Sequence, residues 1–374
     1  MHYVYLDFNS TSPLAPSVHE AMEPFWAEHF MLPGQNHAGC QGVAEALERA
    51  REGVAELVGC EAFEIVFTSG GTEANNLAVL GVTNRSASGH VIVSALEHES
   101  VCNAVGSLER RGWRVDVARA GSDGVVEATE IERLLRDDTR LVCLQAANPI
   151  LGTIQPVREV ADICHARQIP IHCDAVQLFG KLPVDVGLLR ADTVSVSGHK
   201  FYGPKGAGAL FVRRGFSLSP VMYGEIREMG LRPGSENVTG WIGLGAASRL
   251  AGRCAAEAAE RMSELRARFV QRLCEQISPQ PTILCEAAER LPNTATIELP
   301  GDAARIARVA RHLVLATPRT AKPADEMTRC LQAIGLSPQR IGRCFRISLG
   351  WTTSQEQIDR AADLLAEAWD TCRA

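Results

Sequence analysis

Short apolar runs alternate with longer amphipathic stretches over residues 64–214. The runs predicted as strands are 64–69, 90–95, 140–147, 169–175, 193–198 and 208–214, and the stretches predicted as helices between them are 72–84, 99–111 and 157–167. Strands separated by helix-length stretches are typical of βαβ units. Their nearly continuous apolar character indicates burial on both faces. The pattern therefore predicts the α/β fold class, with a mostly parallel sheet between helices.

The segments on either side of this alternation follow other patterns. Residues 17–29 and 42–58 are predicted as amphipathic helices, 240–276 as one long helix without proline, 294–300 and 345–350 as strands, and 303–313, 324–334 and 354–370 as helices. The chain has 374 residues, and single hydrophobic cores stop growing at about 250–300 residues. We therefore expect two domains, a large one over 15–260 and a smaller α+β one made of 1–14 with 261–374.

Composition narrows the function classes. A net charge of −6 and a pI of about 6.0 give no electrostatic case for nucleic acid or an anionic membrane surface. No apolar run approaches the ~20 residues of a membrane span, and the N-terminus lacks the pattern of a signal peptide. The twelve cysteines form no C-x-x-C pairs, so we expect reduced thiols in a cytoplasmic protein and no metal site.

Reactive side chains follow several of the predicted strands. In open parallel sheets, ligands bind beyond the carboxyl ends of the strands. After strand 64–69, Gly71 and Thr72 open a helix, which is either a phosphate cradle or an ordinary helix start. His98 follows strand 90–95, as a ligand contact or as a structural histidine. Asp174 ends strand 169–175 with Gln177 three residues later, and a buried carboxylate there calls for a cationic or donor partner.

The stretch SVSGHKFYGPKGAGAL, residues 195–210, places Ser197, His199 and Lys200 at another strand end. A lysine desolvated among small residues has a depressed pKa and becomes a nucleophile suited to Schiff-base formation, whereas the alternative is a surface lysine in a glycine-rich turn. Pyridoxal phosphate (PLP) needs an aldehyde partner, a partner for its pyridinium nitrogen and a phosphate cup. The strand ends supply all three, so the sequence predicts PLP as the cofactor.

Seven motifs carry a resemblance to a known family. They are YLDFNSTSP, EIVFTSGGTEANN, ALEHESV, CDAVQ, SVSGHKFYGPKGAGAL, GLRPGSENV and FRISLGWTT. Together they resemble the cysteine desulfurases, which belong to the class V aminotransferase group of fold-type I PLP enzymes. The resemblance covers nearly the whole chain and implies a fold-type I architecture, a homodimer and an L-amino acid substrate.

The resemblance also implies roles for individual residues. Lys200 would be the Schiff-base lysine, His98 would stack on the pyridine ring and Asp174 would pair with the pyridinium nitrogen. The remaining contacts would be Gln177 with the phenolic oxygen, Thr72, Ser197 and His199 with the phosphate, Ser235 with the phosphate of a neighbouring subunit, and Arg346 with the substrate α-carboxylate. A planar guanidinium suits such bidentate binding.

The chain departs from the family at the catalytic loop. Family members pass sulfur to a loop cysteine, but this chain has no cysteine from 286 to 329, and ungapped alignment from LQAIGL places Thr320 at that position. An alcohol has no comparable thiolate population near neutral pH. Cys40 and Cys330 are candidate replacements, and for both the alternative is a small buried hydrophobe. Arg319 and Lys322 make this loop basic.

Two further motifs differ from those of the cysteine desulfurases. The family's ANNE[TI]G is ANPILG here, so Pro149 replaces a cofactor-contacting asparagine and Asn148 is predicted to compensate from the preceding position. In GEIREMG, Arg227 replaces a glutamine and is a candidate contact for an anionic substrate side chain, or an ordinary solvated cation.

Three functions stay open from the sequence. The first is cysteine desulfurase-like C–S cleavage, with a displaced persulfide nucleophile or none, and a sulfur-acceptor protein as partner if sulfur is transferred. The second is a PLP enzyme retooled for another amino acid, as a transaminase, epimerase, β-eliminase or decarboxylase. The third is a catalytically idle homologue, which the retained Lys200, Asp174 and His98 argue against.

Overall fold

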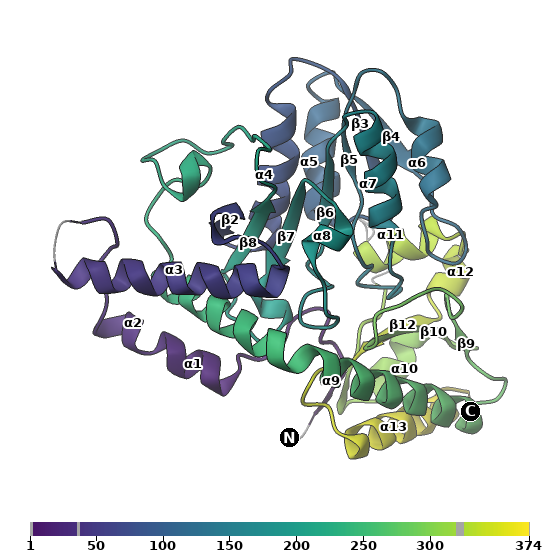
Figure 1. The fold of residues 1–374 in the computed structure, drawn as a ribbon. Coiled ribbons are helices and arrows are strands. Elements are labelled where there is room, and N and C mark those ends of the chain that lie inside the picture. The colour runs from purple at the N-terminus through teal and green to yellow at the C-terminus, as the bar shows by residue number, and fades with distance from the viewer. Residues whose placement is uncertain (1–2, 36–37, 319–324, 374) are drawn as a thin grey trace.

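The computed structural model describes residues 3–35, 38–318 and 325–373, and a seven-stranded sheet forms its centre (Figure 1). The strands run in the order β2 (Ile65–Thr68), β8 (Gly208–Val212), β7 (Thr193–Ser197), β6 (Ile171–Asp174), β5 (Thr139–Cys143), β3 (His90–Ser94) and β4 (Arg114–Ala118). Strand β8 is antiparallel to β2 and β7, and every other pairing is parallel. The predicted α/β fold with a mostly parallel sheet is confirmed.

Helices cover both faces of this sheet. They are α3 (Ala38–Val58), α4 (Gly71–Thr83), α5 (Glu99–Glu109), α6 (Ala128–Leu134), α7 (Val157–Ala166), α8 (Val186–Leu189) and α9 (Val238–Gln276), with α1 (Pro16–Met22) and α2 (Pro24–Ala27) beside α9. In β3, Val91 and Val93 pack with α4 and α5, whereas Ile92 packs in the core cluster on the opposite face. Burial on both sides explains why the strands appear as unbroken apolar runs.

A second layer of structure surrounds a separate core cluster. It contains the antiparallel strands β9 (Thr282–Ile283), β10 (Thr294–Glu298) and β12 (Cys344–Ser348), the helices α10 (Ala303–Val309) and α13 (Gln355–Arg373), and β1 (Val4–Tyr5) paired with β11 (Leu313–Val314). Helices α11 (Glu326–Ala333) and α12 (Pro338–Ile341) pack instead in a core cluster shared with the central sheet. Leu6, Phe269 and Phe345 share the separate cluster. Packing of the N-terminus there supports the proposed two-domain division, whose boundaries stay a prediction.

Several boundaries differ from the sequence prediction. The helix expected over 17–29 breaks between α1 and α2, because Pro24 has no N–H to continue the hydrogen-bond ladder. Strand β4 and helix α6 were not predicted. Strand β4 lies at the sheet edge with Arg114 and Asp116 incompletely buried, so its apolar run is too broken to be recognised.

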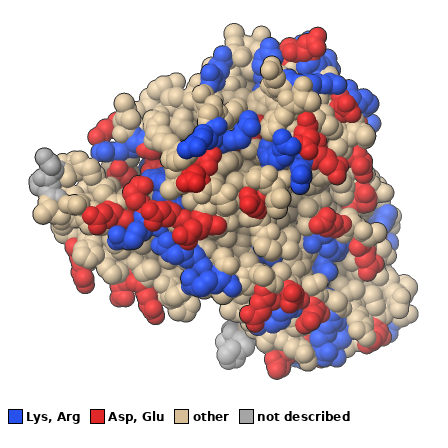
Figure 2. All heavy atoms as spheres, viewed as in Figure 1, with Lys and Arg blue, Asp and Glu red and all other residues tan. Residues whose placement is uncertain are grey.

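The long surface helices carry mixed charges. Acidic and basic side chains are interspersed over the face shown in Figure 2, and on α3 the Arg49 guanidinium lies 4.0 Å from the Glu45 carboxylate one turn away. Such pairs give modest support to a helix. Within the ranges given above, no helix has the length and apolar character that a membrane span requires.

Candidate active site

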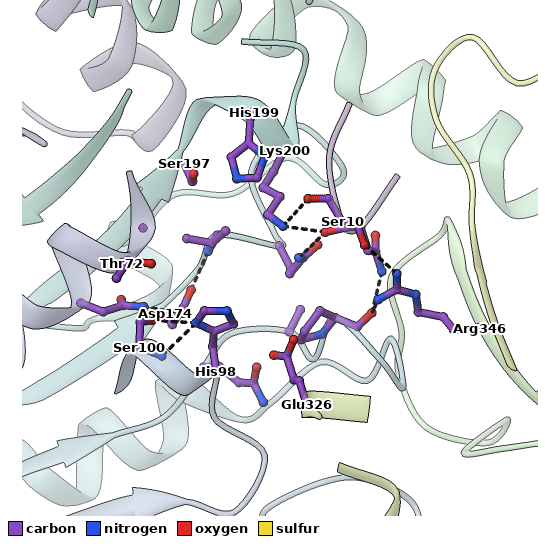
Figure 3. A pocket seen from close by; sticks show the side chains of 18 residues that line it. Ser10, Thr72, His98, Ser100, Asp174, Ser197, His199, Lys200, Glu326 and Arg346 are labelled. Atoms are coloured by element: carbon purple, nitrogen blue, oxygen red, sulfur yellow. Dashed lines mark hydrogen bonds between the residues drawn. The ribbon is translucent and has the colours of Figure 1, made fainter. Parts of the chain in front are cut away.

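A pocket of about 350 Å³ lies beyond the carboxyl ends of the central strands (Figure 3). One wall comes from the seven-stranded sheet and the helices that follow its strands, and includes Asp174 and Lys200. The opposite wall includes Arg346 from β12 and Glu326 from α11. The pocket therefore lies where the two core clusters meet, and it gathers residues as far apart in the chain as Asn9 and Arg346.

The phosphate-cradle residues lie together at one end of the pocket. Thr72 in the first turn of α4, Ser197 at the end of β7 and His199 all line it. A Cβ atom on Gly71 would lie 2.8 Å from Val176 Cγ2, and Gly70 has φ +144°, so this tight entry into α4 requires glycine. The N-terminus of a helix and hydroxyl donors form an anion-binding end.

Burial, together with the nearby positive charge of Lys200, lowers the pKa of His199 to about 4. The imidazole is therefore neutral near pH 7. Its Nδ1 lies 3.1 Å from Thr11 Oγ1, which orients the ring. A neutral imidazole at this end offers a hydrogen bond to an anion rather than a full positive charge.

Asp174 is fixed by hydrogen bonds at both carboxylate oxygens. Asn75 Nδ2 donates to Oδ2 over 2.7 Å, and the Val176 backbone N–H donates to Oδ1 over 3.0 Å. Asp174 is only 7% exposed and lines the pocket. Because a buried carboxylate needs donors or a cation, these two bonds stabilise it where it can meet a cationic ring nitrogen.

Behind Asn75 lies a hydrogen-bonded layer that the sequence did not reveal. His172 Nε2 lies 3.0 Å from Asn75 Oδ1, and Ser195 Oγ donates to the same oxygen. Since Asn75 Nδ2 donates to Asp174, its Oδ1 is an acceptor and His172 carries its proton on Nε2. Burial lowers the pKa of His172 to about 4. This network fixes the Asn75 amide and, through it, the Asp174 carboxylate.

His98 is positioned as the N-cap of α5. Its Nδ1 accepts a hydrogen bond of 3.1 Å from the Ser100 N–H, and the Ser100 hydroxyl lies 2.7 Å from the same nitrogen. The ring lines the pocket on the side opposite Lys200 (Figure 3). The predicted structural role and the predicted ligand contact are thus compatible, because the cap fixes the ring while its face stays open.

Lys200 ends a short 3₁₀ turn, Gly198–Lys200, that follows β7. Its Nζ donates to the backbone carbonyls of Asn9 over 2.7 Å and Ser10 over 2.9 Å. Burial lowers the pKa of Lys200 to about 8, although the Glu326 carboxylate opposes the shift. About a tenth of the amines are therefore uncharged at pH 7, far more than for an ordinary lysine.

Arg346 lines the pocket but already has a partner. Its Nη2 forms an ion pair with Asp7 and lies 3.3 Å from Ser10 Oγ, and its Nη1 donates to the Pro149 carbonyl over 3.0 Å. Its buried Nε has no hydrogen-bond partner among the described residues. The pairing with Asp7, distant in the chain, was not predicted.

Glu326 was not predicted either. It is the first residue of α11 and points into the pocket between His98 and Arg346 (Figure 3). Its Oε1 is buried without a hydrogen-bond partner in the described part of the chain. An acidic residue opening a helix is also a common N-terminal feature, so the sequence alone carried no signal for a pocket role.

The structure does not support the cofactor contact predicted for Asn148. Its side chain lies outside the described lining of the pocket, and Oδ1 accepts the N–H groups of Ile150 and Leu151 over 2.9 and 2.8 Å. Asn148 therefore stabilises the turn that follows β5. The neighbouring Pro149, at the position where the family has asparagine, lines the pocket instead.

Other predicted residues also lie outside the described pocket lining. Arg227 forms ion pairs with Glu225 at 2.8 Å and Glu236 at 3.3 Å, and its role as a substrate contact stays a prediction. Cys40 is 2% exposed in α3. Ser235 is exposed, and its predicted role in a neighbouring subunit is not tested by a single chain.

Two candidate positions for the sulfur-accepting nucleophile remain, the loop position Thr320 and the thiol of Cys330. The described residues provide no reactive thiol at either one. Thr320, with Arg319 and Lys322, lies outside the described residues. Cys330 is 1% exposed in α11, and burial raises its pKa to about 12. A thiol with such a pKa is inert near pH 7.

Comparison with known proteins agrees with this geometry. Residues 4–361 match the family model described as Aminotransferase class-V. The chain belongs to the class-V aminotransferase family. A class-V relative, cysteine desulfurase IscS of Methanosarcina thermophila, is 34% identical over 370 residues, which cover 97% of this chain and 91% of that protein.

Two solved structures share the class-V fold. A NifS-like protein has a TM-score of 0.92 and 31% identity, with 99% of this chain and all of that chain covered. SspA in complex with cysteine has a TM-score of 0.81 and 31% identity, with 92% and 98% covered. The predicted kinship with cysteine desulfurases and the predicted enzyme class are confirmed, and members of this class-V group are PLP-dependent.

The donor set of the pocket fits PLP. The glycine-lined entry to α4, with Ser197 and His199, suits a phosphate. The Asp174 carboxylate suits a protonated ring nitrogen, and the Lys200 amine suits an aldehyde carbon. The three features line one cavity, as a single bound molecule requires.

Proposed function

We propose that this class-V aminotransferase binds PLP at Lys200 and cleaves the C–S bond of L-cysteine or a closely related L-amino acid. The observation that carries the proposal is the Lys200 amine with a pKa of about 8, in one pocket with Asp174, His98 and an anion-binding end. The similarity to cysteine desulfurases over 97% of the chain supports the substrate class.

When bound, PLP supplies an electron sink for bond breaking at the substrate α-carbon. Lys200 would hold its aldehyde carbon through Nζ. Once the substrate amino group takes that place, the Nζ amine is free to remove the Cα proton as a general base. The carbonyls of Asn9 and Ser10 would then accept hydrogen bonds from Nζ and keep it beside the substrate.

The opposite wall would hold the substrate. Arg346 would bind the α-carboxylate, and Asp7 and the Pro149 carbonyl hold its guanidinium in place at the pocket wall. On the cofactor side, Asp174 would keep a proton on the ring nitrogen, and His98 would stack against the ring. Each role rests on where these side chains lie and on the resemblance of their motifs.

The sulfur is proposed to leave as sulfide, without a persulfide on a loop cysteine. The sequence has no cysteine from 286 to 329, Cys330 is buried with a pKa raised to about 12, and Cys40 lies outside the described pocket lining. Cysteine and water would then give pyruvate, ammonia and hydrogen sulfide, a balanced elimination in which no enzyme thiol is oxidised.

Product analysis tests this function. Purified protein is incubated with PLP, L-cysteine and dithiothreitol, and sulfide, alanine, pyruvate and ammonia are measured. Sulfide with equal pyruvate and ammonia supports the proposal, and sulfide with alanine indicates desulfuration through another acceptor. Absence of sulfide would contradict C–S cleavage and favour a PLP enzyme that acts on another amino acid.

A pair of variants at the loop position tests the fate of the sulfur. In Thr320→Cys we expect alanine to replace part of the pyruvate, whereas the matched control Thr320→Ser keeps the wild-type products.

We also propose a homodimer in which Ser235 reaches the phosphate site of the other subunit. Ser235 is exposed on a segment that also exposes Tyr223, Ile226 and Met229 by 86%, 81% and 55%. Exposed large apolar residues gathered on one segment favour an interface.

A sulfur-acceptor protein is a partner only if alanine is the product. The twelve free cysteines support a reducing compartment, proposed as the cytoplasm.

A further inference from the structure

A second buried lysine lies behind the pocket, and neither the motifs nor the proposed mechanism uses it. Lys181 is 4% exposed. Its Nζ donates to Asn9 Oδ1 over 2.8 Å and to Gln177 Oε1. Burial lowers its pKa well below the ordinary value, and Lys200 and Arg346 act in the same direction. Lysine is rarely buried to this degree unless its amine is paired, as it is here with two side-chain oxygens.

The hydrogen bonds around Gln177 define how its amide is turned. Oε1 accepts from Lys181, and Nε2 donates to the Asn9 carbonyl over 3.0 Å. The same carbonyl accepts from Lys200 over 2.7 Å. An amide nitrogen has two hydrogens, so one N–H of Gln177 stays available. Because Gln177 lines the pocket, this second N–H is the group it can present there.

Gln177 Oε1 is the acceptor of the Lys181 hydrogen bond whether or not the Lys181 amine is charged. Asn9 Nδ2 donates to the Pro149 carbonyl over 2.8 Å and to Thr294 Oγ1, so Asn9 Oδ1 is fixed as an acceptor. An amine has at least two N–H groups whether or not it is protonated, which is enough for Asn9 Oδ1 and Gln177 Oε1. Lys181 therefore fixes the amide in either state.

We propose that Lys181 is a positioning residue that turns the Gln177 amide so that an N–H, and not the carbonyl oxygen, faces the bound cofactor. This inference rests on the proposed function, because it assigns the N–H to the phenolic oxygen of PLP. A donor at that oxygen stabilises its negative charge and weakens its hold on the neighbouring proton of the bound chromophore. Lys181 thus sets the spectral pKa of the bound coenzyme without touching it.

The test is a pH titration of the visible absorption band of the PLP-reconstituted protein. In Lys181→Met, Gln177 Oε1 loses its donor, and we expect the spectral pKa to rise by about one unit, as loss of a hydrogen bond to a charged group predicts. Gln177→Leu is expected to raise it equally, and the double variant no further, because the two residues act through one hydrogen bond.

Asn293→Ala is the matched control. Asn293 Nδ2 donates to the same Asn9 Oδ1 over 3.1 Å and to the Leu349 carbonyl over 2.9 Å, rather than to Gln177. It should lower the melting temperature and keep the wild-type spectral pKa. An unshifted Lys181→Met, or an equal shift in Asn293→Ala, overturns the inference. If Lys181→Met does not fold, Gln177→Leu decides, since an unshifted value there also overturns it. A wild-type protein that takes up no PLP instead refutes the proposed function.

Discussion

The two walls of the pocket differ in how completely their polar side chains are hydrogen-bonded within the protein. On the sheet wall, Asp174 has two donors, Asn75 is held from behind by His172, and His98 caps a helix. On the opposite wall, Glu326 Oε1 is buried without a partner among the described residues, and Arg346 is paired with Asp7 rather than left open. The first wall suits a permanently held molecule, and the second suits a ligand that comes and goes.

The difference between the two walls parallels where the sequence matches the cysteine desulfurase motifs and where it departs from them. The residues of the sheet wall belong to motifs that resemble the cysteine desulfurases, whereas Pro149, whose carbonyl accepts a hydrogen bond from Arg346, departs from the family. Under the proposed function, the cofactor contacts match those of the family, whereas the fate of the substrate sulfur differs. The following variants test the two walls separately.

The largest effect is expected on the sheet wall. Asp174→Asn keeps the shape of the side chain but removes the charge that is proposed to pair with the ring nitrogen, and we expect kcat to fall about 1000-fold, in the range seen when one preorganised electrostatic group is removed. Steady-state rates of sulfide release measure the change. A fall of less than tenfold would show that the ring nitrogen does not depend on this carboxylate.

The second prediction concerns stability in acid. The native pKa of His172 is about 4 and its ordinary value is 6.5, so the unfolded chain binds more protons between these values and stability is lost as the pH falls through this window. From pH 7 to pH 5 this residue should remove about 2 kcal/mol from the unfolding free energy. Urea unfolding at both pH values should show a smaller loss in His172→Gln, and an unchanged pH dependence would refute the assignment.

The third prediction addresses the substrate wall. Arg346→Lys keeps the charge but loses the forked geometry, and we expect KM to rise about 30-fold with a smaller change in kcat. Binding of PLP should be unaffected, which equilibrium dialysis can check. If PLP affinity falls as much as substrate affinity, Arg346 belongs to the cofactor wall and the contrast between the walls is wrong.

The last prediction concerns Asn148, where stability is expected to change and function is not. Asn148→Ala leaves the buried N–H groups of Ile150 and Leu151 unpaired and should lower the unfolding free energy by about 2 kcal/mol. PLP affinity should not change, because this side chain lies outside the described pocket lining. Thermal unfolding and a PLP titration of the same variant distinguish this from the cofactor contact that the sequence predicted, which would weaken PLP binding directly.

The sequence predicts well what is local. Apolar runs buried on both faces marked β5, β6 and β7, and the glycines before Thr72 marked the entry to α4. Pairings across the chain were out of reach, because no local pattern shows that Asp7 meets Arg346 or that Lys181 meets Asn9. Asn148 was assigned by its position in a motif, whereas its amide is used by the turn itself.

The most direct test of the account is to find which lysine carries the coenzyme. The chain has four lysines, at 181, 200, 205 and 322, so borohydride reduction of the PLP-reconstituted protein followed by peptide mass spectrometry can separate them. The account predicts a single phosphopyridoxyl group on Lys200 and its loss in Lys200→Ala. A modification on Lys181 or Lys205 instead, or none in a protein that is folded, would contradict it.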